Sequence, residues 1–158
     1  LPARLGHAAR QVLRLAPAAG AIGCGCGRTD HLEAVASGPA MAAEYAARAG
    51  VPTQPLQAVV ALMHSGDPIA RAVVSDAGTL LGRVLAGIAT AFDPEVIVIG
   101  GGAAQIGADL LSPLTSAFRV EAMGPIAETA ILPARLGTDA PLVGAALLAA
   151  ATRIEVTP

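Results

Sequence analysis

Gly6 and His7 begin a segment that ends in Cys24-Gly25-Cys26-Gly27-Arg28-Thr29-Asp30-His31-Leu32-Glu33. Both cysteines of the protein and two of its three histidines lie in this segment. Zinc accepts two thiolates and two imidazoles in a tetrahedral site, and that set is present here as His7, Cys24, Cys26 and His31. The glycines at positions 25 and 27 allow a turn tight enough for both thiols to point at one centre. The segment therefore predicts a zinc site.

Another interpretation of the same residues stays open. In this interpretation Cys24 and Cys26 are two small buried apolar residues, and His31 lies at the start of a helix and faces water. A disulfide between cysteines two positions apart is strained, so we do not expect one. The spacing of all four side chains together favours metal binding.

These residues resemble the zinc-and-sugar motif of the ROK family, which contains sugar kinases and sugar-responsive transcriptional repressors. The family motif is G-H followed by C-x-C-G-x-x-G-C-L-E, and this chain has His31 at the third cysteine and Asp30 before it. Histidine still ligates zinc. The resemblance implies that His7 and Glu33 also hydrogen-bond sugar hydroxyls. Arg4 stands where the family usually has a sugar-binding glutamate, which implies an altered substrate or lost sugar binding.

A second block runs from Asp93 to Gly102. Residues 95–99, Glu-Val-Ile-Val-Ile, contain a β-branched run without polar alternation, which predicts a parallel strand buried on both faces. The turn Gly100-Gly101-Gly102 and a helix from about Ala104 to Phe118 are expected to follow it. A strand, a glycine turn and a helix N-terminus together form an anion site. The chain holds no lysine, which excludes a P-loop, and Gln105 replaces the third glycine of the dinucleotide fingerprint.

Three glycines alone are more often a tight turn than a ligand site. The whole block, however, resembles the ROK loop that packs against the adenine nucleotide. The resemblance therefore implies that Gly100, Gly101 and Gly102 contact a nucleotide.

Caps and hydrophobic periodicity predict the other elements. We expect helices from Ser37 to Ala49, Pro55 to His64 and Asp67 to Phe92, a strand from Thr129 to Pro133, and a last helix ending near Ala151. The helix through Met41 and Tyr45 is expected to lie over the zinc loop, and His64 to have a surface or capping role. Gly78, Gly82 and Gly87 interrupt the longest helix. Because each glycine costs roughly 1 kcal/mol against alanine, they predict the close approach of a neighbour.

A third block, Leu136 to Ala146, resembles the closing segment of ROK sugar kinases. The resemblance then covers essentially the whole chain, in three blocks and in the family order. It implies an α/β, actin-like ATPase (ribonuclease H-like) fold, of which residues 1–158 are the C-terminal lobe. The family's first lobe carries an Asp-x-Gly-x-Thr phosphate loop and the aspartate that deprotonates the sugar. Neither occurs here, so we expect these 158 residues not to be a working kinase.

Composition limits the partners and the location. A net charge of −2 without a basic cluster argues against nucleic acid binding through this segment. Two cysteines with metal spacing fit a reducing cytoplasm. The chain opens without a signal peptide at Leu1, and the run from Leu142 to Ala151 is too short to cross a bilayer. A cytoplasmic protein without a membrane span is therefore expected.

Three functions follow from the resemblance. The leading one is the C-terminal lobe of an ATP-dependent hexose kinase of glucokinase type, with structural zinc, ATP with magnesium, and a hexose or amino-sugar as substrate. The second is the sugar-sensing effector domain of a ROK repressor, and the third is a non-binding remnant that acts in dimer contact. We expect a homodimer or higher oligomer. A winged helix-turn-helix upstream of the first lobe would identify the repressor.

Overall fold

The computed structural model describes residues 22–29 and 31–151. Its α-helices are α3 (Glu33–Ala36), α4 (Gly38–Ala49), α5 (Leu56–His64), α6 (Pro68–Phe92), α7 (Ala108–Glu121) and α8 (Ala140–Ala151). Two strands, β1 (Val96–Ile99) and β2 (Ala130–Pro133), pair in parallel, and short 3₁₀ turns are η1 (Ala103–Ile106), η2 (Gly124–Glu128) and η3 (Gly137–Asp139).

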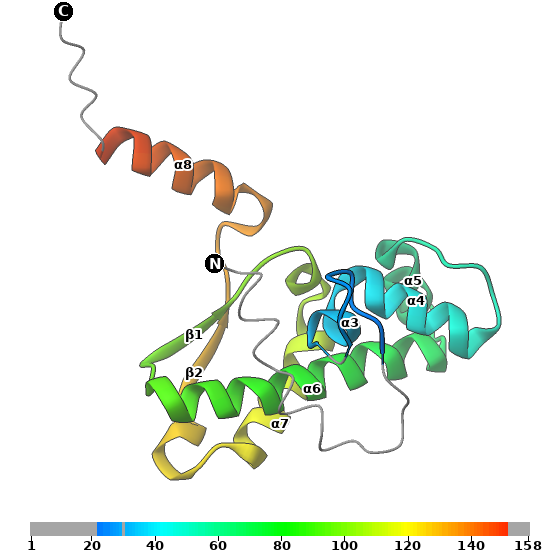
Figure 1. The fold of residues 1–158 in the computed structure, drawn as a ribbon, viewed down its shortest axis with the longest axis horizontal. Helices are drawn as coiled ribbons and strands as arrows, with labels where there is room; N and C mark the ends of the chain where they lie inside the picture. The colour runs from blue at the N-terminus through cyan, green and yellow to red at the C-terminus, as the bar shows by residue number, and fades with distance from the viewer. Residues whose placement is uncertain (1–21, 30, 152–158) are drawn as a thin grey trace, which may run out of the picture.

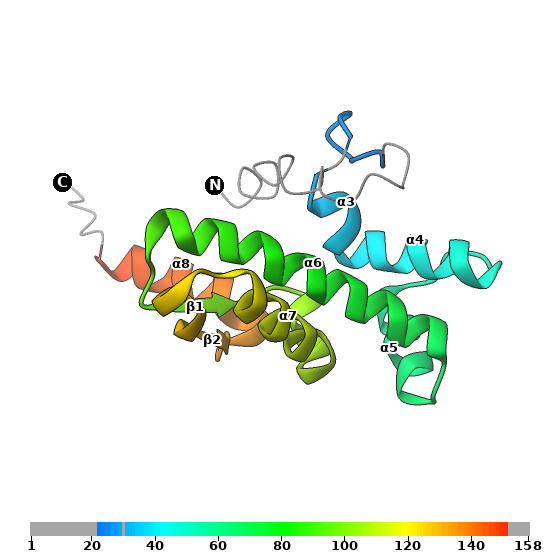
Figure 2. The ribbon, with the colours of Figure 1, turned by 90° about the horizontal axis from the view of Figure 1, so that it is seen from below.

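The 25-residue helix α6 runs the length of the structure (Figures 1 and 2). Helices α3, α4 and α5 gather along one half of it, and the two strands lie beside the other half. Val73, Val74 and Ala77 are buried in the core that α6 shares with α4 and α5. At the other end, Ala86 and Ala89 pack with Phe118 of α7, and the half-buried Ile97 and Ile131 of the sheet cover them. The chain therefore has its core on both halves of one helix.

Helices α6 and α7 touch backbone to backbone. A Cβ atom built on Gly78 would lie 2.6 Å from the carbonyl oxygen of Leu110, and one on Gly82 would collide with the carbonyl oxygen of Leu114. Only glycine allows this approach. The prediction of a close neighbour is confirmed at these two positions. It is wrong for Gly87, which is exposed and has nothing within 4 Å of its position for a Cβ.

One carboxylate joins α4 to the start of α6. Asp67 Oδ1 accepts hydrogen bonds from the amides of Ile69 (2.8 Å) and Ala70 (3.0 Å), as the predicted N-cap requires. Its Oδ2 accepts a hydrogen bond from the hydroxyl of the buried Tyr45 at 2.9 Å. The Ala70 amide and then the Tyr45 hydroxyl lower the pKa of Asp67, because both stabilise its charged form. Asp67 therefore fixes where α6 begins and where α4 lies on it.

The helix boundaries predicted from caps are confirmed. Ser37 Oγ accepts from the amide of Ala40 at 3.3 Å, and Gly50 ends α4 in the left-handed conformation (φ 68°). Helices α5, α6 and α8 and strand β2 match the expected ranges to within two residues where a bound was given. Residues 152–158 lie outside the described residues.

Two predictions about the sheet region are wrong. Among the described residues, strand β1 is not buried on both faces: Val96 is 45 % exposed and Val98 59 % exposed, because α6 and α7 pack on one face of it in this part of the chain. The glycine turn does not lead directly into a long helix either. The 3₁₀ turn η1 and Gly107 (φ 73°) intervene, so α7 begins at Ala108.

Helix α6 is also long enough and apolar enough to span a membrane, judged by its length and composition alone. Of its most apolar 18-residue window, 44 % is buried inside the structure. Its apolar side chains face α4, α5, α7 and the sheet, which is the arrangement of a core helix.

The α6–α7 contact generates a test by substitution. We expect Gly82→Ala to lower the free energy of unfolding by about 1–3 kcal/mol, because the new methyl group meets the backbone of α7. The measurement is urea unfolding followed by circular dichroism.

Gly87→Ala is the matched control, on the same helix with open space around it. It should leave stability unchanged or raise it by up to about 1 kcal/mol through helix propensity. Equal effects of the two substitutions would show that α6 and α7 are not in close contact.

Candidate functional site

Cys24 to Arg28 form a tight turn. The amide of Cys24 donates to the carbonyl of Arg28 (2.7 Å), and the amide of Gly27 donates to the carbonyl of Cys24 (2.9 Å). Gly23 and Thr29 close the turn as an antiparallel bridge. Gly27 has φ 84°, which favours glycine, whereas Gly25 has no positive φ. The turn thus depends on Gly27, not on both glycines as the sequence suggested.

This turn, here called the cysteine turn (residues 23–29), brings both sulfurs to the buried His31. Cys26 Sγ lies 3.2 Å from His31 Nδ1, and one ligand atom from each of Cys24, Cys26 and His31 lies within 4.8 Å of the others. Cys24 is 8 % exposed and His31 3 %, while Cys26 is exposed. The interpretation of His31 as a helix-start residue that faces water is therefore excluded.

The three side chains fit a zinc ion by type and by spacing. Sulfur and nitrogen ligands lie about 2.0–2.3 Å from zinc, so two ligand atoms of a tetrahedral site stand about 3.3–3.8 Å apart. The observed separations, none above 4.8 Å, are close to those of ligands that share one zinc ion. A fourth ligand is needed. The predicted one, His7, lies outside the described residues, as does Arg4.

Glu33, the other predicted sugar contact, begins α3 directly after His31 and Leu32. It is exposed and lines a cavity of about 550 Å³ together with Cys24. The floor of this cavity is the outer face of α4, with Ala40, Ala43 and Ala47. Helix α4 thus lies beside the cysteine turn as expected, but through its alanines, since Met41 and Tyr45 point into the core. The structure therefore brings Glu33 to the cysteine turn.

The glycine turn after β1 borders a second groove. Gly102 and Ala103 form one wall, and the other consists of the start of α4 and the segment before α5. The groove has a volume of about 690 Å³, and none of the described residues that line it is charged. Those beyond the glycine turn are Gly38, Pro39, Ala42, Thr53, Gln54, Pro55, Leu56 and Gln57.

Gly101 has φ 93°, and within the described residues the amides of Gly101 and Gly102 donate no hydrogen bond. The expected site for an anion is thus only partly present. The amides at the glycine turn are available, but the N-terminus of α7 lies beyond η1 and does not open onto the turn. Gly100 is at the end of β1, where a Cβ would lie 3.3 Å from that of Ala134.

No motif in the sequence indicated that Thr53, Gln54 and Gln57 form a wall of this groove. Thr53 and Gln54 follow Pro52 in a loop without a motif, and Gln57 lies in the first turn of α5. They reach the glycine turn only through the fold. His64 was expected on the surface, and its Nε2 lies 3.1 Å from Asp109 Oδ2 at an exposed position.

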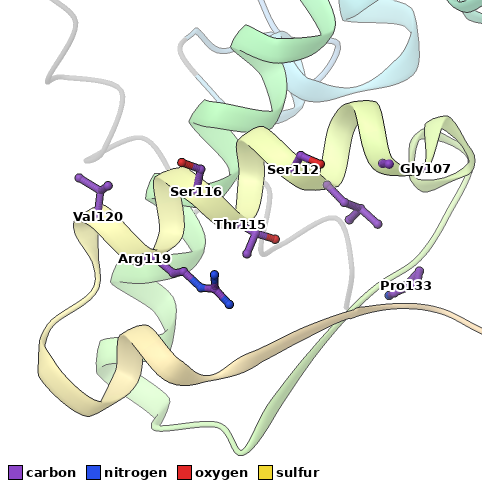
Figure 3. Close-up of a pocket in the computed structure, with 9 residues that line it drawn as sticks. Gly107, Ser112, Thr115, Ser116, Arg119, Val120 and Pro133 are labelled. Carbon is purple, nitrogen blue, oxygen red and sulfur yellow. The ribbon is translucent and has the colours of Figure 1, made fainter.

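A further cavity of about 780 Å³ lies between α7 and Pro133 at the end of β2 (Figure 3). Thr115 and Arg119 project toward it. None of the described residues that line it was predicted as a site residue, and the one charged side chain among them, Arg119, is exposed. The candidate functional site therefore consists of the cysteine turn with Glu33 and of the groove at the glycine turn.

Comparison with known proteins assigns the class. The sequence profile of the ROK family matches residues 2–152, and this chain belongs to the ROK family. A glucokinase of the family from Streptomyces griseus, solved in complex with glucose and AMPPNP, superposes with a TM-score of 0.74 at 30 % identity; the match covers 83 % of this chain and 48 % of that one. A ROK family transcriptional regulator, a homologue of the E. coli MLC protein, gives a TM-score of 0.74 at 28 % identity, over 93 % of this chain and 38 % of that one.

The N-acetylmannosamine kinase of Salmonella newport (strain SL254) is 35 % identical over 126 residues, which are 80 % of this chain and 42 % of the enzyme. The family and the actin-like ATPase fold expected from the sequence are thereby confirmed. The chain spans about 42 % of the length of the curated relatives it matches.

Proposed function

We propose that this chain is the C-terminal lobe of an ATP-dependent hexose kinase of glucokinase type. The observation that carries the proposal is the groove between the glycine turn and the segment before α5. Its lining is uncharged, with hydroxyl and amide groups, which suits the base and ribose of a nucleotide better than its phosphates. The amide of Gly102, which donates no hydrogen bond within the described residues, borders the same groove. The phosphates and magnesium would be held outside it, with the first lobe.

The substrate we propose is a hexose or an amino-sugar. The similar kinases act on glucose and on N-acetylmannosamine, as their names state. Glu33 is exposed at the cavity beside the cysteine turn, where a carboxylate can accept hydrogen bonds from two sugar hydroxyls. His7 would contact the same sugar. These residues bind and orient; the base that deprotonates the sugar and the phosphate loop belong to the first lobe, so the 158 residues alone would not be active.

The second candidate is the effector domain of a ROK transcriptional repressor. It is supported by the superposition on the MLC homologue. Arg4 is also compatible with it, because a sensor does not need the catalytic geometry of the family glutamate.

We further propose that zinc binds His7, Cys24, Cys26 and His31 and has a structural role. Support comes from the convergence of three of these side chains at the cysteine turn. Zinc would supply the bonds that fix Glu33 in place, two residues after His31.

The zinc proposal predicts one zinc per chain in protein purified without added metal, measured by elemental analysis. Cys26→Ser should lower the zinc content, because it removes a ligand at an exposed position without opening the core. His64→Ala should leave the zinc content unchanged, since His64 pairs with Asp109 and lies apart from the cysteine turn. A zinc content near zero in the wild type, or a melting temperature that a strong chelator does not change, would contradict the proposal.

The nucleotide proposal predicts that Gly102→Val weakens the binding of ATP with magnesium by at least about tenfold. Gly102 has φ −62° and nothing within 4 Å of its Cβ position, so valine fits the backbone and fills part of the groove. The measurement is titration calorimetry on the protein as its gene encodes it, with ATP-dependent phosphorylation of glucose and N-acetylmannosamine assayed in parallel.

Gly87→Val is the control, because it adds the same side chain at an exposed position of α6. Unchanged ATP affinity in Gly102→Val would mean that the groove does not hold the nucleotide. Sugar binding without ATP binding or phosphorylation in the wild type would favour the repressor.

A further inference from the structure

The segment before α5 forms one wall of the groove at the glycine turn, and its backbone is well fixed. Gln54 stands directly before Pro55, and a residue that precedes proline is restricted to an extended backbone. The carbonyl of Pro55 accepts a hydrogen bond from the amide of Ala58 at 2.9 Å, which fixes the start of α5. Leu56 packs on the start of α4, since its Cδ2 lies 3.2 Å from where a Cβ on Gly38 would stand. Gln54 is therefore held at one place on the wall, although it lies in a loop.

The groove offers apolar surfaces together with two carboxamides. Pro39, Ala42 and Ala103 line it with carbon atoms, and Gln54 and Gln57 bring amide groups to the same space. Its volume of about 690 Å³ lies within the range of about 300–1,000 Å³ for small-molecule sites. Apolar walls suit the faces of a planar base, and a few polar groups suit its edge.

The two glutamines differ in burial. Gln54 is half-buried, whereas Gln57 in the first turn of α5 is exposed. Within the described part of the chain neither carboxamide makes a hydrogen bond, and the polar atoms of Gln54 are accessible from outside. A hydrogen bond made by a half-buried group meets less competition from water. Gln54 is therefore the better placed of the two to recognise a ligand in the groove.

A carboxamide matches the edge of either purine. It has a carbonyl acceptor and an NH₂ donor side by side. On its Watson–Crick edge adenine presents the N6 donor and the N1 acceptor, and guanine presents the O6 acceptor and the N1–H donor in the same places. Turning the carboxamide over exchanges its donor and its acceptor, so one glutamine pairs with either base. A carboxylate would favour guanine, but none of the described residues that line the groove is charged.

We propose that Gln54 recognises the purine base in this groove, and that the protein consequently binds GTP about as well as ATP. The inference rests on the proposed function, because it takes the groove as the site of the nucleotide base. It adds the residue that determines which nucleotide binds. The sugar site at the cysteine turn has no part in it.

Backbone groups of the same wall would give a different specificity. An amide and a carbonyl in an extended segment cannot exchange places, whereas the two ends of a carboxamide can. A base held by the backbone of Thr53 and Gln54 would therefore be one purine and not the other. The ratio of the affinities for ATP and GTP distinguishes the two modes of recognition.

The test is titration calorimetry of the protein as its gene encodes it, with the magnesium complexes of ATP and GTP. We expect the wild type to bind the two nucleotides with dissociation constants within about tenfold of each other. Gln54→Glu should raise the affinity for GTP relative to ATP by at least about tenfold, because a carboxylate accepts from N1–H and N2–H of guanine and meets the N1 acceptor of adenine unfavourably. The added charge acts on both triphosphates alike, so the ratio reports on the base.

Gln57→Glu is the matched control, because it adds the same charge to the same wall at an exposed position. It should leave the ratio of the two affinities unchanged. An equal change of the ratio in Gln57→Glu would overturn the inference, since the effect would then come from charge on the wall and not from the position of Gln54.

Two further results would overturn the inference while leaving the proposed function in place, provided that Gly102→Val still weakens ATP binding. One is a wild type that binds either nucleotide more than about tenfold tighter than the other. The other is an unchanged ratio in Gln54→Glu. A wild type that binds neither nucleotide would contradict the proposed function itself, and the inference with it.

Discussion

The contact between Gly78 and Gly82 of α6 and the backbone of α7 is the constraint on which the rest of the structure depends. Because glycine has no side chain, the backbone of α6 at Gly78 and Gly82 lies directly against backbone carbonyl groups of α7. This close packing leaves α7 little freedom to slide along α6. Phe118, with no exposed surface, then fills the space between α6 and the strands. Strand β1 lies between these two helices in sequence, so its position, and that of the glycine turn after it, follow from the contact.

The other half of α6 positions the second wall of the groove. Asp67 caps α6 and holds Tyr45 of α4, while Arg48 of α4 donates to Asp76 of α6 at 2.7 Å. The buried contacts of Met41 and Val59 fix α4 and α5 on the same helix. The groove between the glycine turn and residues 53–57 thus has one wall held by α7 and one held by α4 and α5. Both walls are held by helices that pack against α6, so the distance between the walls depends on the helix packing.

Local signals in the sequence predicted the elements well, and long-range arrangements poorly. Ser37, Gly50 and Asp67 have their predicted capping roles because a cap depends on residues within one turn of helix. The convergence of Cys24, Cys26 and His31 could be predicted because no more than seven positions of the chain separate any two of them. Gly78 and Gly82 could not be told apart from Gly87, because only the position of α7 distinguishes them. The exposure of Val98 escaped prediction for a similar reason: an apolar run shows that a strand prefers cover, but not whether cover is present.

Hydrogen exchange across α6 and α7 measures the central constraint most directly. If the glycine contact joins the two helices into one unit, the central amides of α6 and α7 exchange slowest in the chain and with the same free energy, that of global unfolding. Amides of α7 that exchange through a local opening, with a free energy well below that of α6, would contradict this account of the fold.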